Sequence, residues 1–290
     1  MTRWNNHLKT IVLLGALSAL LVGIGNVVAP GHLGIFAVMA LAMNLGAYYF
    51  SDRLVLRMHG AREVDPSQAP RLYGTVRELA ARAALPMPRV YLIEDPQPNA
   101  FATGRDPAHG VVAVTTGILD VLSPRELRGV LAHELAHIKN RDILVSTIAA
   151  CVTGAITYAA HAAGFLGMGS PEDGDGEHAS PWAGVLMALV APLAATMIQL
   201  GISRSREYLA DETGAAISGD PLALANALAR LEQAATAVPS MAAQPATASL
   251  FIVHPFAGGA RAARLFSTHP PTADRIARLE AIAGRGLARG

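Results

Sequence analysis

The stretch Ser123–Asp142, with the sequence SPRELRGVLAHELAHIKNRD, decides the local fold at the centre of this chain. It opens with a serine, a proline and, three residues after the serine, Glu126, which is the capping-box pattern of a helix start. Apolar residues then recur at helical spacing as far as Ile138. The sequence therefore predicts a helix that begins after Ser123 and ends near Asn140.

This helix carries the motif H-E-L-A-H at residues 133–137. His133 and His137 are four residues apart, so both imidazoles lie on one helix face and can point at one metal ion. Burying such groups on a mostly apolar helix is costly unless a metal satisfies them. The motif predicts a zinc hydrolase with two histidine ligands, Glu134 as general base and an open coordination position.

A third ligand is predicted on a second helix, in the segment EYLAD at residues 207–211. Glu207 and Asp211 are four residues apart and share a helix face. Glu207 is the candidate zinc ligand, and Asp211 is the candidate acceptor of a hydrogen bond from a ligand imidazole, a contact that fixes the tautomer. A solvated acidic face would give the same pattern. Glu212 is a competing ligand, although no aspartate follows it one turn later.

The composition indicates a membrane protein with a soluble part. The chain has 290 residues, of which 52% are hydrophobic and 16% charged. Its formal net charge of +1 gives no case for nucleic-acid binding. The single cysteine, Cys151, excludes a disulfide framework and a cysteine-based zinc site.

Four apolar runs have about the length that spans a bilayer. They are Ile11–Ala29, Leu33–Phe50, Ile143–Met168 and Trp182–Ser203. The first two predict a helical hairpin, although the first run alone also has the pattern of a signal peptide. The last two predict a second hairpin that either spans the bilayer or lies buried over the catalytic domain.

Basic residues orient these runs, because they flank each hairpin on its outer sides. They are Arg3, Lys9, Arg53, Arg57, Arg62, Lys139, Arg141, Arg204 and Arg206. The loops inside the two hairpins contain no Lys or Arg, and the loop 169–181 is acidic. The positive-inside rule therefore predicts that both chain ends and the catalytic segments are cytoplasmic. It places the acidic loop on the far side, which is the periplasm if the cell is Gram-negative.

The predicted fold is a mainly α membrane protein with four apolar helical spans and a cytoplasmic α+β zincin domain of the gluzincin-like type, which carries a small sheet. The N-terminal transmembrane hairpin covers residues 1–52, and the zinc peptidase domain begins with 53–142. The second apolar hairpin, 143–203, interrupts that domain, which resumes at 204–290. Two spans between the metal-binding helices return the chain to the same side, so the three ligands can meet.

The soluble parts combine amphipathic helices with short strands. Helices are predicted at 70–85, 203–218, 220–231 and 272–283, with a mobile loop at 234–249. Strands are predicted at 89–94, 99–104 and 111–116, and the last two form a hairpin. The strand NAFATG, 99–104, is a candidate edge strand that pairs with an extended peptide, so Asn99, Ala100 and Phe101 are candidate substrate-binding residues. These strands also have a simpler interpretation, as packing for the helix.

Four motifs occur in an order that resembles the HtpX-type membrane zinc metallopeptidases, which are related to the CAAX prenyl proteases and to the mitochondrial inner-membrane peptidase family. They are NAFATG (99–104), AHELAHIKNRD (132–142), SREYLADETGA (205–215) and STHPPTADRI (267–276). The resemblance covers nearly the whole chain. It implies a single zinc held by His133, His137 and Glu207, with Glu134 catalytic. It also implies quality control of membrane proteins under heat or envelope stress.

The same resemblance places the histidine–proline segment at residues 269–271 near the active site. His269 is therefore a candidate donor to the tetrahedral oxyanion, beside zinc. Arg204 is a rival for this role. His269 also has the simpler interpretation of a residue that precedes a helix.

The sequence as a whole predicts a membrane-anchored zinc endopeptidase that cleaves misfolded or damaged membrane proteins from the cytoplasmic side. Its partners would be membrane-protein substrates and the bilayer. One alternative is a CAAX-type processing protease, which would require a larger intramembrane chamber than four spans supply. A second is a non-enzymatic membrane scaffold with a structural zinc. A structural zinc is normally closed by a fourth protein ligand, and no further residue stands in a ligand pattern.

Overall fold

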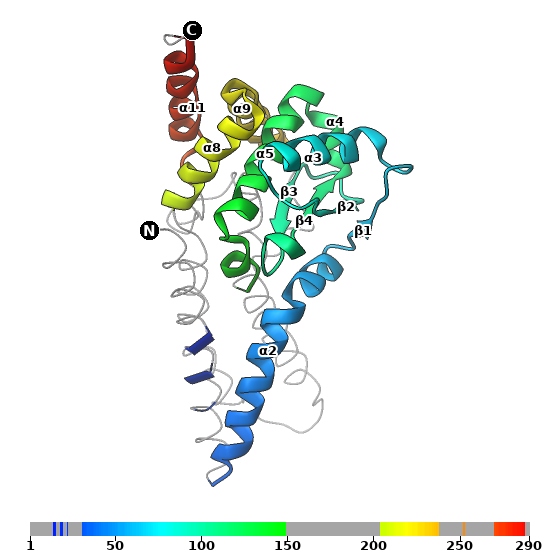
Figure 1. Ribbon diagram of the computed structural model, residues 1–290, viewed down its shortest axis with the longest axis vertical. Coiled ribbons are helices and arrows are strands. Elements are labelled where there is room, and N and C mark those ends of the chain that lie inside the picture. Colours follow the sequence, from blue (N-terminus) through cyan, green and yellow to red (C-terminus); the bar gives the residue numbers. More distant parts are fainter. Residues whose placement is uncertain are drawn as a thin grey trace, which may run out of the picture.

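The computed structural model of the chain describes residues 31–148, 204–237, 252 and 270–287, together with positions 14, 15, 18, 19 and 22. These parts are mostly helical, with one small sheet (Figure 1). The helices are α2 (Leu33–Met58), α3 (Pro70–Arg82), α4 (Thr116–Val121), α5 (Pro124–Asn140), α8 (Arg204–Ser218), α9 (Pro221–Ala237) and α11 (Thr272–Leu287). The strands are β1 (Arg62–Glu63), β2 (Arg89–Ile93), β3 (Ala100–Thr103) and β4 (Val111–Thr115), and a 3-10 turn covers Pro107–His109.

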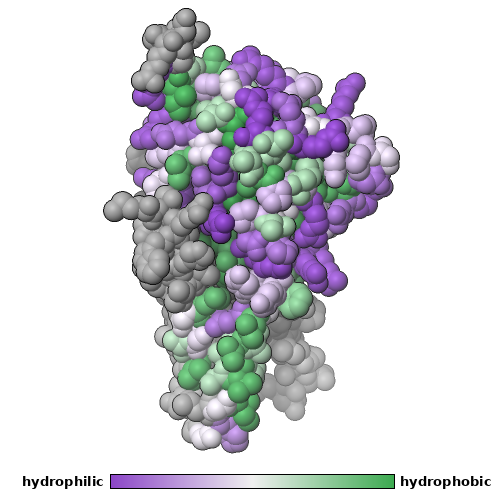
Figure 2. All heavy atoms as spheres, viewed as in Figure 1, coloured by the Kyte–Doolittle hydropathy of each residue, from purple (hydrophilic) through white to green (hydrophobic). Residues whose placement is uncertain are grey.

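One helix among the described residues, α2, is long and apolar enough to cross a membrane. It projects away from the sheet in Figure 1, and apolar side chains gather along it in Figure 2. The helix was predicted to end at Phe50, but it continues to Met58. Val55 and Leu56 explain the difference, because they are buried against the sheet and keep the last turns helical. Of the other predicted spans, the first is described only at isolated positions, and the last two lie almost wholly outside the described residues.

The sheet is mixed, with the strand order β1-β2-β4-β3. β2 and β4 are parallel, whereas β3 pairs with β4 antiparallel, with Ala100 opposite Val114 and Thr103 opposite Val111. The predicted hairpin of the last two strands is thereby confirmed. The order also makes β3 an edge strand, as predicted, so one of its edges has no strand partner within this sheet.

Helix α5 forms as its sequence predicts. The Ser123 hydroxyl accepts from the backbone N–H of Glu126, and the Glu126 carboxylate accepts from the backbone N–H of Ser123, which completes the capping box. The helix stops after Asn140, where Arg141 takes the left-handed conformation with φ of 58°. This turn directs the next residue back over the last turn of the helix.

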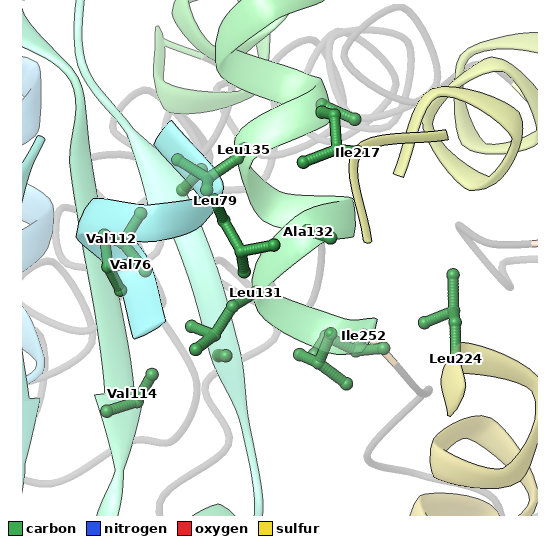
Figure 3. Packing of buried hydrophobic residues seen from close by; sticks show 14 of the residues in the cluster. Val76, Leu79, Val112, Val114, Leu131, Ala132, Leu135, Ile217, Leu224 and Ile252 are labelled. Carbon is green, nitrogen blue, oxygen red and sulfur yellow. The ribbon is translucent and has the colours of Figure 1, made fainter. Parts of the chain in front are cut away.

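The core is built around α5, which lies between the sheet on one side and α8 and α9 on the other (Figure 1). Leu131 and Leu135 of α5 are fully buried. Figure 3 shows them among side chains from the sheet, from α3 and from the second half of the chain. One contiguous apolar cluster therefore joins the segments on either side of residues 149–203.

Two glycines allow α8 and α9 to approach α5 closely. A Cβ at Gly214 of α8 would lie 2.9 Å from the Cα of His133, and a Cβ at Gly129 of α5 would lie 2.6 Å from the backbone nitrogen of Leu224. Both distances are shorter than any normal carbon contact, so only glycine fits. The closeness of α8 to the backbone of His133 positions the second ligand-bearing helix.

Three of the predicted helix ends are wrong by three to six residues. α3 ends at Arg82 because Ala84 adopts a left-handed conformation with φ of 54°. α9 extends to Ala237, so the first residues of the predicted mobile loop are helical, and the described part of that loop is not a loop. α11 extends to Leu287. α3 is therefore shorter than predicted, whereas α9 and α11 are longer than predicted.

A surface ion pair links the start of α5 to the start of α9. It predicts that the stability of the fold depends on pH. Arg125 donates to both carboxylate oxygens of Asp220, at 2.6 and 2.9 Å. These hydrogen bonds lower the pKa of Asp220 from its usual value, against partial burial. A carboxylate with a depressed folded-state pKa stabilises the fold above its unfolded pKa, and that contribution is lost as pH falls through the folded value.

We therefore expect Asp220→Asn to lower the melting temperature at pH 7, and this difference from the wild type to shrink as pH falls from 7 into the acid range, through the lowered folded-state pKa of Asp220. Asparagine keeps the side-chain oxygen that accepts from the backbone N–H of Ala223, so the helix cap is retained. Thermal unfolding of both proteins across this pH range measures the difference. An equal difference at every pH would show that the charge of Asp220 makes no contribution.

Candidate metal centre

Three predicted ligands meet between α5 and α8. One donor atom from each of His133, His137 and Glu207 lies within 4.8 Å of the other two. The two imidazole Nε2 atoms are 3.1 Å apart, and each is 3.7 Å from one carboxylate oxygen of Glu207. Ligands at about 2.1 Å from a tetrahedral zinc stand about 3.4 Å from one another. Two imidazoles and one carboxylate at these separations fit a zinc ion and leave a fourth position open.

Each imidazole has a carboxylate on its other ring nitrogen. His133 Nδ1 lies 3.0 Å from an oxygen of Asp211, and His137 Nδ1 lies 3.1 and 3.2 Å from the two oxygens of Asp142. Such carboxylates hold the proton on Nδ1 and turn Nε2 toward a metal. Asp211 lies close enough to His133 for the contact predicted for it, and its role in fixing the tautomer stays a prediction.

Asp142 was missed by the sequence reasoning, which treated its neighbours only as charges flanking a span. It is 2% exposed, and it reaches His137 because Arg141 reverses the chain after α5. A signal was present: an aspartate follows five residues after the second histidine and two residues after the expected helix end. A chain that turns back there brings this side chain over the last helical turn.

The electrostatics of the site favour a bound cation. Burial lowers the pKa of His137, but Asp142 and the carboxylates of Glu207 and Glu134 outweigh it and raise that pKa to about 10. Burial raises the pKa of Glu134, although the positive charges of the two imidazoles act to lower it. Several carboxylates thus surround two imidazoles in a water-poor environment. A metal cation held by the Nε2 atoms would satisfy the same negative potential that otherwise retains a proton.

Glu134 belongs to the metal-binding helix α5, and its side chain contacts the edge strand β3. Its side chain is buried, and its Oε2 accepts a hydrogen bond of 2.8 Å from the backbone N–H of Ala102 in β3. That N–H belongs to the edge of β3 that faces away from β4. The carboxylate therefore stands where a peptide pairing with the free edge of β3 would pass.

Arg275 is the second residue that the sequence reasoning missed. Only 1% of it is exposed, and its Nε and Nη2 donate to the two oxygens of Asp211 at 2.9 and 2.7 Å. Its Nη1 lies 3.8 Å from Glu207 Oε2 and donates to the carbonyl of Ile252 at 3.4 Å. Arg275 stands four residues before the buried Leu279 of α11. A cation on the apolar face of an amphipathic helix was the signal that could have identified it.

The three predicted substrate-binding residues lie at the start of β3 and are buried. Asn99 Oδ1 accepts from the backbone N–H of Ile252 at 3.3 Å, and Asn99 N–H donates to Thr115. Ala100 belongs to the main core cluster, whereas Phe101 packs against the end of α2. The backbone of this strand, more than these side chains, adjoins Glu134.

The remaining candidates are placed as follows. Glu212, the competing ligand, is exposed on α8 and lies outside the metal-ligand group. Arg204, the rival for oxyanion stabilisation, is exposed at the start of the same helix. His269 lies outside the described residues.

Replacing Asp142 by asparagine is expected to weaken zinc binding by about 10–100-fold, because the amide cannot accept the proton of His137 with the strength of a carboxylate. Zinc affinity is measured by competition with a chromogenic chelator. Asp120→Asn, at an exposed position of α4, is the matched control and should bind zinc as the wild type does. Equal zinc affinity in Asp142→Asn and in the wild type would exclude this role for Asp142.

A helix with H-E-x-x-H, a carboxylate from a second helix and an edge strand beside the glutamate define a zinc metallopeptidase. The family model of Peptidase family M48 matches residues 66–283 of this chain. The chain belongs to this family, and it is a membrane zinc metalloprotease, as the four sequence motifs predicted.

Curated relatives agree with this assignment over almost the full length. A protein described as "Protease HtpX homolog" in Ralstonia pickettii is 53% identical over 285 residues, which are 97% of this chain and 98% of the relative. Another of that description in Methylibium petroleiphilum is 54% identical over 280 residues, covering 96% and 98%.

Among solved structures, Ste24p of S. mikatae is similar in fold. The match has a TM-score of 0.50 and 18% sequence identity, and it covers 95% of this chain and 64% of Ste24p. This chain therefore spans a little under two thirds of the Ste24p chain. The likeness supports the predicted mainly helical fold with a small sheet.

Proposed function

We propose that the chain is a membrane-anchored endopeptidase in which His133, His137 and Glu207 hold one zinc and Glu134 is the general base. The observation that carries this proposal is the convergence of three donor atoms within 4.8 Å, beside a buried glutamate on the same helix. Zinc bound there would supply a Lewis acid for the peptide carbonyl and for the attacking water. Glu134 would accept a proton at its carboxylate and deliver it to the leaving amine.

The substrate would pair with the free edge of β3 as an additional strand. Support comes from the strand order, which leaves β3 at the edge, and from the hydrogen bond between Ala102 N–H and Glu134. Asn99 directly precedes this strand and Ala100 and Phe101 begin it, and we propose that the three form part of the substrate-binding segment. For Asn99 the role is indirect, since its amide oxygen orders the backbone at Ile252. His269 remains our proposed donor to the oxyanion.

The membrane anchor would be multi-pass, with four spans and a cytoplasmic catalytic domain. Asn44 of α2 donates to Ser18 Oγ at 2.6 Å and to the carbonyl of Leu14 at 3.4 Å, which supports packing of the first apolar run against α2. Hydrogen bonds of this kind join helices inside bilayers. The proposed divisions remain 1–52, 53–142, 143–203 and 204–290, although α2 itself extends to Met58.

The substrates would be misfolded or damaged membrane proteins, cleaved on the cytoplasmic side as part of membrane protein quality control and the stress response. The end of α2 packs on the sheet beside the catalytic centre, so insertion of α2 in the bilayer would bring that centre close to the bilayer surface, where such substrates present unfolded loops. The ligand group found among the described residues contains three protein ligands, and this supports an open, catalytic zinc position.

Proteolysis of an unfolded membrane protein by the full chain in detergent tests this function. We expect cleavage to stop when a zinc chelator is added and to return when zinc is restored, because the ligands bind the metal reversibly. Cleavage that continues at the same rate in chelator, after the zinc content has fallen to zero, would contradict the proposal. A prenylated peptide tested in parallel would separate it from a CAAX-type activity.

A further inference from the structure

The cytoplasmic end of α2 has the composition of a membrane interface. The helix has 26 residues. About 20 residues cross the hydrocarbon of a bilayer. Counting from Leu33, that many residues end near Asp52. Tyr49 and Phe50 are half exposed at this level, at 50% and 55%, where aromatic side chains collect at the headgroups.

Arginine side chains are held against both aromatic rings. The guanidinium of Arg53 lies 5.6 Å from the ring centre of Phe50, and that of Arg105 lies 5.7 Å from the ring centre of Tyr49. Tyr49, Arg53 and Arg57 follow one another at intervals of four residues, so they share one helix face. Two basic residues of α2 and one from elsewhere in the chain thus converge on this face.

Arg105 comes from the turn that joins β3 to β4. Gly104 begins this turn with φ of +131°, and a side chain there would collide with the carbonyl of His109. The turn is held by Asp106, which accepts from the backbone N–H groups of Ala108 and His109. The position of Arg105 against α2 is therefore fixed by the backbone of the hairpin.

The carboxylates near this face are already engaged. Asp52 pairs with Arg89 at 3.1 Å, and Asp106 is occupied by its own turn and stands 3.6 Å from Arg105. Arg53 and Arg57 are exposed and form no ion pair with a carboxylate among the described residues. The face presents an excess of positive charge directly above an exposed apolar helix surface.

We propose that Arg53 and Arg105, together with Tyr49, bind the phosphate of an anionic phospholipid whose chains lie along α2. The inference rests on the proposed insertion of α2 in the bilayer. Cationic side chains at this level attract anionic headgroups, and the apolar face of α2 accommodates acyl chains. The lipid would hold the β3–β4 turn, and with it the edge strand whose Ala102 N–H contacts Glu134.

The test is the melting temperature of the full chain in neutral detergent, with added short-chain phosphatidylglycerol. We expect the melting temperature to rise with the concentration of the lipid, because a ligand that binds only the folded state stabilises it by mass action. Short-chain phosphatidylcholine and glycerol phosphate should have little effect. Arg53→Gln and Arg105→Gln should each weaken the apparent affinity about fivefold, and the double variant about 25-fold. Arg71→Gln, an exposed position on α3, is the control and should respond as the wild type does.

Hydrogen exchange gives a second measurement at the turn itself. Phosphatidylglycerol should slow exchange at residues 103–110 in the wild type and not in the double variant. Equal stabilisation by phosphatidylcholine or by glycerol phosphate would overturn the proposal, as would an undiminished response in the double variant. Both measurements are made in the Glu134→Gln background, so they do not depend on peptidase activity. The chelator experiment above decides the proposed function separately.

Discussion

Glu134→Gln is expected to lower kcat by about 10²–10⁴-fold while the zinc remains bound. Glutamine has nearly the same shape and keeps an oxygen to accept from Ala102 N–H, but it cannot take a proton from water. The loss should appear in kcat rather than in KM, because the side chain acts in proton transfer. Steady-state kinetics on a quenched peptide, with zinc content measured by mass spectrometry, gives both quantities.

The control for this variant is Glu212→Gln, which makes the same chemical change at an exposed position of α8. It should have the kcat and the zinc content of the wild type. Activity of Glu134→Gln within a factor of two of the wild type would remove Glu134 from the mechanism. Loss of zinc from that variant would instead indicate that Glu134 supports metal binding.

Arg275→Met is expected to lower the free energy of unfolding by about 3–5 kcal/mol, because it leaves the buried carboxylate of Asp211 without its cation. Zinc affinity should also fall, by about 10–100-fold, since Asp211 then no longer holds His133 in a fixed orientation. Chemical unfolding and a zinc competition assay measure the two effects separately.

A double variant distinguishes the cost of an unpaired charge on Asp211 from the cost of losing the packing of Arg275. Adding Asp211→Asn to Arg275→Met removes the unpaired charge and keeps an oxygen near His133 Nδ1, so a large part of the lost stability should return. Zinc affinity should recover less, because an amide is the weaker acceptor. If the double variant is as unstable as Arg275→Met, the cost lies in the packing of the arginine rather than in the isolated carboxylate.

The sequence predicted the parts of the site that are encoded locally. His133, Glu134 and His137 lie within one turn of a helix whose start is specified by its own capping box, so their relative positions follow from helix geometry alone. Glu207 and Asp211 were predicted by the same reasoning on a second helix. The structure brings these residues together in the arrangement that the spacing indicates.

What the sequence left undetermined depends on contacts between distant segments. Arg275 meets Asp211 across 64 positions of the chain, and no local pattern specifies that pairing. Asp142 required knowledge that Arg141 adopts a left-handed conformation, which is uncommon for arginine. α2 runs past its apolar stretch because Val55 and Leu56 pack on the sheet, a tertiary effect that hydropathy does not register.

The residues of the metal centre are spread along the chain, so they are synthesised at different times. His133 and His137 are synthesised first, Glu207 follows more than sixty positions later, and Arg275 comes later still. Until α8 has been synthesised, the nascent chain holds only two of the three zinc ligands. Until α11 has been synthesised, it also lacks Arg275, the arginine that pairs with Asp211. The complete metal centre can therefore form only after Arg275 has been synthesised, so a nascent chain that stops short of α11 is expected to be inactive.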